Sequence, residues 1–171
     1  EKEITLSAEM KKLLSTTKKV VSGEELCKML LTLDVDLLFN GGVGTYVKGT
    51  DENNLDLGDK QNEAVRVDAS ELRAKIVCEG GNLGLTQKAR IEYALNGGRI
   101  NQDAIDNAAG VNTSDHEVNL KILLYMLVEK GILTTQQASE TLQSLSEQVV
   151  TKVLQNNYDQ ALVISFDENL S

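Results

Sequence analysis

Two apolar runs that each end in a loop of glycines constrain the fold of this chain most strongly. Residues 35–39 and residues 74–78 are mostly apolar, and each run leads into small residues with one asparagine. The residues of these two loops are Asn40, Gly41, Gly42, Gly80, Gly81 and Asn82. A short, nearly continuous apolar run is typical of a strand that is covered on both faces in a parallel sheet. We therefore expect two buried parallel strands, each of which ends in a glycine loop.

Helix signals stand next to both predicted strands. Ser22 and Glu25 form a capping box, which predicts a helix over residues 23–31 directly before the first strand. Thr86 predicts the start of a helix after the second glycine loop, and Gly97 is suited to end that helix. Helices that alternate with buried strands indicate an α/β fold with a parallel sheet.

The second half of the chain carries a third loop of small residues and then two helical patterns. Residues 104–105 predict a very short third strand, which ends at Asn107. Ser114 and Glu117 form another capping box, so we expect a helix to begin there. The spacing of leucine and valine over residues 135–156 predicts a last long helix.

Composition and charge argue against several classes of function. The chain of 171 residues has 26 acidic and 17 basic side chains, a formal charge of -9 that would repel nucleic acid. The cysteines, Cys27 and Cys78, suggest neither a disulfide framework nor a zinc site, so we predict no metal. No apolar run approaches the roughly 20 residues that span a membrane, and residues 1–5 lack a signal-peptide core. We expect a soluble, cytoplasmic protein and, since the chain starts at Glu1, a piece of a longer one.

The first glycine loop does not match the known phosphate-binding motifs. Residues 42–47 nearly spell G-x-G-x-x-G, but Val47 stands in the place of the third glycine. The polar residues 48–66 that follow predict a surface excursion and offer no helix that could face a pyrophosphate. Residues 48–50 also reverse the order that a P-loop needs. Taken alone, this loop is best interpreted as an ordinary turn.

Three loops that each carry an asparagine are harder to explain as turns. Asn40, Asn82 and Asn107 each follow a predicted strand. In an open α/β sheet, ligands bind beyond the carboxyl ends of the strands, and an asparagine amide can both donate and accept a hydrogen bond there. We therefore predict that the three asparagines share one crevice and bind a flat cofactor ring. The alternative is that asparagine and glycine occur in these loops because they tolerate positive φ angles.

Three stretches of the sequence resemble a known enzyme family. The stretches "DLLFNGGVGTYVK", "KIVCEGGNLGLTQKARIEYALNGGRIN" and "DAIDNAAGVNTSDHEVNLKILL" are similar to segments of the large bacterial NAD-specific glutamate dehydrogenases, and the likeness covers residues 4–165. The resemblance implies the second half of a Rossmann-like NAD-binding domain over residues 1–113 and a C-terminal helical segment over residues 114–171. It also implies NAD as the cofactor, oxidative deamination of L-glutamate to 2-oxoglutarate and ammonium, and a homo-oligomeric parent enzyme.

The resemblance also implies roles for individual residues. Asn107 would hold the nicotinamide carboxamide, the loop of Asn82 would lie beside the cofactor, and Val111 and Ser114 would contact glutamate. As the N-cap of a helix, Ser114 would offer free backbone amides to the side-chain carboxylate of the substrate. A plain helix cap is an equally good interpretation of Ser114, because acidic side chains follow it. The residues predicted to bind the cofactor are Asn40, Gly41, Gly42, Gly80, Gly81, Asn82 and Asn107.

The chain lacks part of what the resemblance leads us to expect. The catalytic lysine and aspartate of the family and its pyrophosphate-binding loop have no counterpart in the 171 residues. We therefore predict no catalytic residue here and expect the chain alone to be inactive. Two alternatives stay open. One is another amino-acid dehydrogenase, for which residues 111 and 114 decide the substrate, and the other is a non-catalytic module whose helices after residue 114 bind a partner chain.

Overall fold

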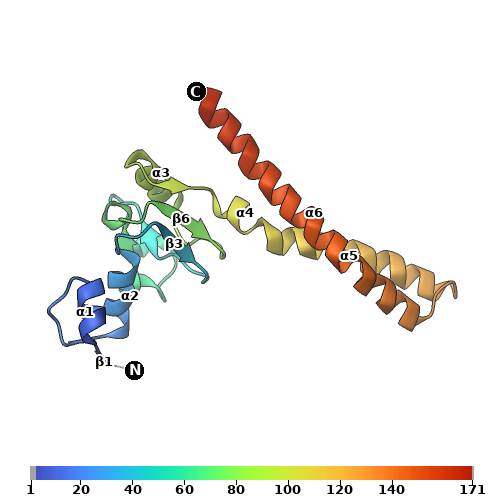
Figure 1. Cartoon of the computed structure of the whole chain (residues 1–171), viewed down its shortest axis with the longest axis horizontal. Coiled ribbons are helices and arrows are strands. Elements are labelled where there is room, and N and C mark those ends of the chain that lie inside the picture. Colours follow the sequence, from blue (N-terminus) through green and yellow to red (C-terminus); the bar gives the residue numbers. More distant parts are fainter. Residues whose placement is uncertain (1–2, 171) are drawn as a thin grey trace. The chain divides into compact units, whose positions relative to one another are not determined.

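The sheet that carries the glycine loops consists of three short parallel strands in the order β3-β6-β7. The strands are β3 (Leu37–Asn40), β6 (Ile76–Glu79) and β7 (Arg99–Ile100). The structure, a computed structural model, describes residues 3–170 and contains two compact units, one that ends at Asp103 and one that begins at Ala104 (Figure 1). The two strands predicted from the apolar runs, and their parallel pairing, are confirmed.

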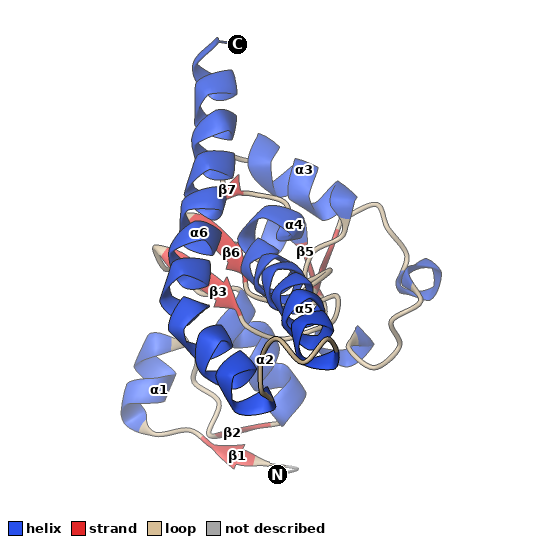
Figure 2. Cartoon of the chain, turned by 90° about the vertical axis from the view of Figure 1, so that its right-hand side faces the viewer, coloured by secondary structure: helices blue, strands red, loops and turns tan. Residues whose placement is uncertain are grey.

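The remaining elements of the first unit are short (Figure 2). Its helices are α1 (Ala8–Leu13), α2 (Gly23–Leu31) and α3 (Gln87–Leu95), and its 3₁₀ turns cover Asn54–Leu57, Glu63–Val65 and Ala69–Glu71. The other strands form an antiparallel pair, β1 (Ile4–Thr5) with β2 (Val20–Val21), and a parallel pair, β4 (Val47–Lys48) with β5 (Val67–Asp68). The fold is therefore α/β, with small sheets joined by helices and loops.

Side-chain caps fix where the helices of the first unit begin. The Ser22 hydroxyl accepts a hydrogen bond from the backbone N–H of Glu25 at 3.1 Å, and the Thr86 hydroxyl accepts one from Ala89 at 3.0 Å. After α3, Gly97 has a φ angle of 91°, which a residue with a Cβ atom rarely adopts. The predicted positions of α2 and α3 are thus confirmed.

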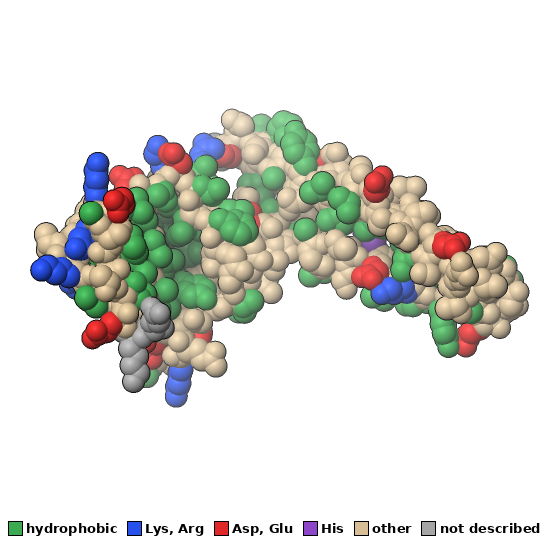
Figure 3. Space-filling view, turned by 60° about the horizontal axis from the view of Figure 1, so that its bottom comes forward, with side chains coloured by type: hydrophobic (Ala, Val, Ile, Leu, Met, Phe, Trp, Pro, Cys, Tyr) green, Lys and Arg blue, Asp and Glu red, His purple; other side chains and the backbone are tan. Residues whose placement is uncertain are grey.

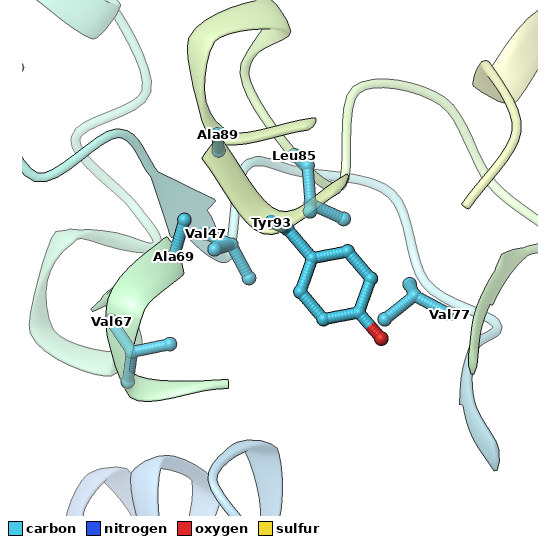
Figure 4. Close-up of a cluster of buried hydrophobic side chains, with 7 residues drawn as sticks. All are labelled: Val47, Val67, Ala69, Val77, Leu85, Ala89 and Tyr93. Carbon is cyan, nitrogen blue, oxygen red and sulfur yellow. The ribbon is translucent and has the colours of Figure 1, made fainter. Parts of the chain in front are cut away.

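The hydrophobic core of the first unit draws its side chains from α3, from strands β4, β5 and β6, from the 3₁₀ turn at Ala69 and from the segment before α3. Its buried residues are Val47, Val67, Ala69, Val77, Leu85, Ala89 and Tyr93 (Figure 4). The Tyr93 hydroxyl donates to the backbone carbonyl of Ala74 at 2.6 Å, and burial raises the pKa of this phenol. The hydrogen bond and the apolar contacts together hold α3 against the sheet.

The edge strand β3 is open on one face. The side chains of Leu37 and Phe39 are 54% and 62% exposed, so the prediction that this strand is covered on both faces is wrong. Leu38, on the opposite face, packs against the core. The reason is that the helices of this unit cover only the face that carries Leu38.

Residues 48–66 form the predicted surface excursion, and a buried arginine anchors it. Arg66 donates from Nε to the carbonyl of Thr45 at 2.8 Å, from Nη1 to Oδ1 of Asn54 at 3.0 Å, and from Nη2 to the carbonyl of Asp59 at 2.6 Å. Through these three hydrogen bonds, the guanidinium ties two residues of the excursion to the segment of Thr45.

The second unit is built from two long helices, α5 (Ala108–Glu129) and α6 (Thr135–Leu170), which pack against each other. The single helical turn α4 (Asp103–Asp106) precedes them. The third strand predicted over residues 104–105 is wrong, because these residues are helical and the third strand of the sheet is β7. Two apolar residues carry too little periodicity to distinguish a strand from a helical turn.

The helix boundaries of the second unit also differ from those predicted. The helix expected to begin at Ser114 begins at Ala108, and the last helix continues past residue 156 to Leu170. The predicted domain boundary after residue 113 falls inside α5. In the described part of the chain, no helix combines the length and the apolar character that are needed to cross a membrane.

Candidate functional site

The two predicted glycine loops lie side by side at the carboxyl ends of β3 and β6. Asn40, the last residue of β3, lies opposite Glu79, the last residue of β6, and the Gly80 N–H donates to the Asn40 carbonyl at 2.9 Å. A Cβ atom built on Gly81 would overlap the backbone carbonyl of Gly42. Only glycine lets two main chains approach this closely. The structure therefore brings the two loops into direct backbone contact.

The Asn40 amide is held between these loops. Its Oδ1 accepts a hydrogen bond from the Gly42 N–H at 3.4 Å. A Cβ atom on Gly84 would overlap the Nδ2 atom of Asn40 and would lie 2.5 Å from Oε1 of Glu79. The asparagine amide and the glutamate carboxylate therefore meet beside Gly84, and a larger residue at this position would displace them.

Asn82 and Leu83 form the exposed tip of the second loop. Leu83 has a φ angle of 59°, in the left-handed region that disfavours a residue with a side chain by roughly 1–2 kcal/mol. The Leu83 N–H donates to Oδ2 of Asp103 at 2.8 Å. A hydrogen bond from outside the loop thus helps to hold this backbone conformation.

A buried ion pair lies next to the second loop, and the sequence analysis did not find it. Arg90 of α3 is 6% exposed and pairs with Glu79, which is fully buried. Nη1 of Arg90 also donates to the carbonyl of Asn101 at 2.8 Å, and Nη2 lies 3.9 Å from Oδ1 of Asp103. The available signal was the position of Arg90 three residues before the apolar Tyr93, on the buried face of the helix, where a charge needs an acidic partner.

A pocket of about 260 Å³ opens beside the ion pair. Thr45 and Leu57 line it from the side of the surface excursion, and Leu83, Arg90 and Asp103 line it from the side of the second loop. A lining of aliphatic, hydroxyl and charged side chains suits a small group with both polar and apolar parts.

The other predicted site residues belong to the second unit. Asn107 directly precedes α5 and is partly buried, whereas Val111 and Ser114 are exposed on α5 itself. The structure thus brings together the six predicted residues of the first two loops, and it carries the remaining three on a separate unit. Whether Asn107 shares a crevice with Asn40 and Asn82 stays a prediction.

The predicted role of Ser114 as a helix cap is wrong. Because α5 begins at Ala108, Ser114 lies inside the helix, where its backbone N–H takes part in helical hydrogen bonding and is not free for an anion. The neighbouring His116 is exposed, and Glu117 pairs with Lys121 one turn later at 2.5 Å. The capping-box pattern of Ser114 and Glu117 therefore belongs to exposed residues inside a helix and does not mark a helix start.

Residues 3–170 contain no group of three or more histidine, cysteine or acidic side chains that could hold a metal ion. Neither cysteine forms a disulfide; Cys27 is exposed and Cys78 is partly buried. The polar groups of the candidate site include amides, backbone groups, the Thr45 hydroxyl, the Asp103 carboxylate and the Glu79–Arg90 pair.

Comparison with known proteins shows which family this chain belongs to. Residues 1–167 match the model of the family described as bacterial NAD-glutamate dehydrogenase, catalytic domain. The chain is 46% identical over 170 residues to the NAD-specific glutamate dehydrogenase of Halomonas elongata, a match that covers 99% of this chain and 10% of that protein.

Two further relatives carry the same name. The chain is 49% identical over 164 residues to the protein of Pseudomonas aeruginosa, with 96% of this chain and 10% of that protein covered. It is 46% identical over 166 residues to the protein of Mycobacterium tuberculosis, with 94% and 10% covered. The chain thus spans about a tenth of the length of these relatives. These matches show that the chain belongs to the bacterial NAD-glutamate dehydrogenase family, within the catalytic domain.

Proposed function

We propose that this chain is a part of an NAD-dependent glutamate dehydrogenase, which oxidatively deaminates L-glutamate to 2-oxoglutarate and ammonium. The observation that carries the proposal is the backbone contact between the loops of Gly42 and Gly81 at the carboxyl ends of two parallel strands. In sheets of this kind the ligand binds at that edge. Membership of the bacterial NAD-glutamate dehydrogenase family supports NAD as that ligand.

The loop residues fit the nicotinamide part of NAD. Gly41 and Gly80 are exposed and carry no side chain, and the Phe39 ring lies against the position that a Cβ atom on either would take, so a flat ring would meet their backbone beside Phe39. Asn40 and Asn82 bring amides to the same two loops, and an amide can pair with a carboxamide or a ribose hydroxyl. Bound NAD supplies a carbon that accepts hydride, and the protein orients this carbon and excludes water.

The residues of the second unit complete the proposal. Asn107 would hold the carboxamide of the nicotinamide, and Val111 and Ser114 would contact the substrate. These assignments rest on the resemblance of the segment around Asn107 to glutamate dehydrogenases. We expect the chain alone to be inactive, because the catalytic lysine and aspartate of the family have no counterpart in it.

The proposal includes the architecture and the setting of the parent enzyme. The parallel sheet would be half of a Rossmann-like domain, with β3 as the edge at which the sheet continues. The thiols of Cys27 and Cys78, which form no disulfide, suit the reducing cytoplasm. The exposed apolar side chains of α5 and α6 suit a homo-oligomer or another protein contact (Figure 3).

The test is steady-state kinetics of a full-length dehydrogenase that carries this chain, with the substitution Asn107→Ala. Loss of one hydrogen bond to the carboxamide should raise the KM for NAD roughly three- to tenfold and lower kcat. Asn119→Ala is the matched control, because Asn119 lies on α5, the helix that Asn107 precedes, and its amide donates to the carbonyl of Asp115 at 2.8 Å. Equal kinetics of the two variants would contradict the assignment of Asn107.

The choice of substrate needs a separate measurement on the same enzyme. Turnover of L-glutamate but not of branched-chain amino acids is expected. The opposite preference would favour another amino-acid dehydrogenase with the same sheet.

A further inference from the structure

We propose that Arg90 and Asp103 are positioning residues that hold the second glycine loop in the shape in which it meets the cofactor. This inference rests on the proposed function, because it gives the loop of residues 80–84 its role at the nicotinamide. Neither residue would touch the reacting atoms. Arg90 would act through Glu79, which precedes the loop, and Asp103 through Leu83, which lies in the loop tip.

Arg90 fixes the start of the loop. Its guanidinium pairs with the fully buried Glu79, the residue at which β6 ends and the loop begins. It also donates to the carbonyl of Asn101 at 2.8 Å, which ties α3 to the segment after β7. An arginine that is 6% exposed and has two fixed partners has little freedom to move. The end of β6 is therefore held from the side of α3.

Asp103 holds the loop tip itself. Its Oδ2 accepts the Leu83 N–H at 2.8 Å, while its Oδ1 lies 3.9 Å from Nη2 of Arg90. One carboxylate thus faces both the guanidinium and the residue with a φ angle of 59°. A left-handed leucine persists only where its surroundings stabilise that conformation. Asp103 supplies this stabilisation from a residue 20 positions away in sequence.

The arrangement reaches the first glycine loop as well. Gly84 has no room for a Cβ atom, because Nδ2 of Asn40 and Oε1 of Glu79 occupy that space. A shift of Glu79 would therefore move the Asn40 amide, which is one of the groups proposed to meet NAD. Arg90 therefore joins four segments. They are α3 itself, the end of β6 at Glu79, the end of β3 through Glu79, and Asp103 at the start of α4.

The experiment compares Asp103→Ala, Asp103→Asn and Asp51→Ala in a full-length dehydrogenase that carries this chain. Asparagine retains an oxygen that can accept the Leu83 N–H, whereas alanine does not. Asp51 is the matched control, because its carboxylate is 72% exposed and pairs with Lys88 of the same helix α3 at 3.1 Å. The measurements are KM for NAD, KM for L-glutamate, kcat and thermal stability.

We expect Asp103→Ala to raise the KM for NAD roughly tenfold or more, as is typical for the loss of a hydrogen bond to a charged group. The KM for L-glutamate should stay within about twofold of the wild-type value. Asp103→Asn should recover most of the affinity for NAD. The double variant Asp103→Ala with Leu83→Gly should recover part of it, because glycine adopts a positive φ angle without strain.

The outcomes separate this inference from the proposed function. A wild-type enzyme that does not oxidise L-glutamate with NAD would overturn both. An active wild-type enzyme in which Asp103→Ala and Asp51→Ala have the same KM for NAD would overturn the positioning role alone. A loss of thermal stability and kcat in Asp103→Ala with an unchanged KM for NAD would show a merely structural role, and would also overturn it.

Discussion

The two units of this chain obtain their order in different ways. The first unit buries seven hydrophobic side chains in one cluster and, beside them, the charged pair of Glu79 and Arg90. Among the described residues of the second unit, only Leu124 and Val153 are buried, although both helices are long. The first unit thus depends on contacts between distant segments, whereas the second depends mostly on helical hydrogen bonds and a narrow seam between two helices.

This difference separates the two kinds of predicted site residue. In the first unit, the loop of Asn40 and the loop of Asn82 are fixed by contacts across the sheet, so their relative geometry is built into the unit. In the second unit, Val111 and Ser114 are surface residues of a helix, which sets only their spacing. Substrate contacts proposed for these residues depend on what faces the helix.

The largest expected effect that tests this comparison is the loss of the buried arginine. Arg90→Met should lower the free energy of unfolding of the first unit by about 3–5 kcal/mol, because Glu79 would be left as an uncompensated buried charge. Amide hydrogen exchange of the 171-residue chain, read residue by residue, measures the stability of each unit separately. Exchange in α5 and α6 should not change.

A second variant shows whether the charge or the volume matters at this pair. Replacing both partners, with Arg90→Met and Glu79→Leu together, should restore much of the lost stability, because two apolar side chains leave no charge unpaired. A double variant that is as unstable as Arg90→Met would contradict this explanation.

A smaller effect is expected from the seam of the second unit. Leu124 is 8% exposed, so Leu124→Ala should destabilise the helix pair by about 2–3 kcal/mol. The adjacent Leu123 is 55% exposed, and Leu123→Ala should change the stability by less than about 0.5 kcal/mol. Amide exchange of α5 and α6 is again the measurement. Similar losses in the two variants would show that the chain uses both faces of α5 for packing.

The smallest effect concerns pH and the surface excursion of the first unit. The side-chain amide of Asn62 and the backbone N–H of Thr45 donate to the Asp59 carboxylate at 2.9 and 2.8 Å. Both hydrogen bonds lower the pKa of Asp59, the one from Asn62 more than the one from Thr45, and the nearby charge of Arg66 lowers it further. A lowered pKa in the folded state means that this stabilisation is present above the unfolded pKa, near 3.8, and is lost as the pH falls through the folded value.

The substitution Asp59→Asn isolates this contribution. The variant should lose less stability than the wild type between pH 5 and about pH 3, by about 1 kcal/mol or less. Denaturant unfolding at a series of pH values measures the difference. Asp56→Asn, an exposed residue of the same excursion, is the control and should follow the wild type. Parallel curves for wild type and Asp59→Asn would exclude a role of Asp59 in the acid sensitivity.

Local signals in the sequence predict much of the first unit. Ser22 and Thr86 mark the starts of α2 and α3 because a hydroxyl cap acts within four residues, which a sequence pattern records directly. The contact between the two glycine loops follows from the rule that parallel strands end at the same edge of a sheet. The meeting of the two loops at one edge could therefore be predicted without coordinates.

Features that depend on distant segments were missed or misplaced. The capping-box pattern of Ser114 and Glu117 is present in the sequence but does not mark a helix start, because residues 108–113 are already helical despite Gly110. The pairing of Arg90 with Glu79 joins residues from a helix and a strand, and no spacing rule links them. Hydrophobic periodicity predicts which face of a helix is buried, but it does not predict which charged residue of another element lies against that face.

The contact of Gly81 with the Gly42 carbonyl has a consequence for how this protein can vary. The shape of the rim between β3 and β6 is set where peptide groups touch, without any side chain in between. A single methyl group at residue 81 would overlap the Gly42 carbonyl and force the two turns apart. The Cα hydrogen of Gly81 therefore cannot be replaced by a side chain without a change in the shape of this rim.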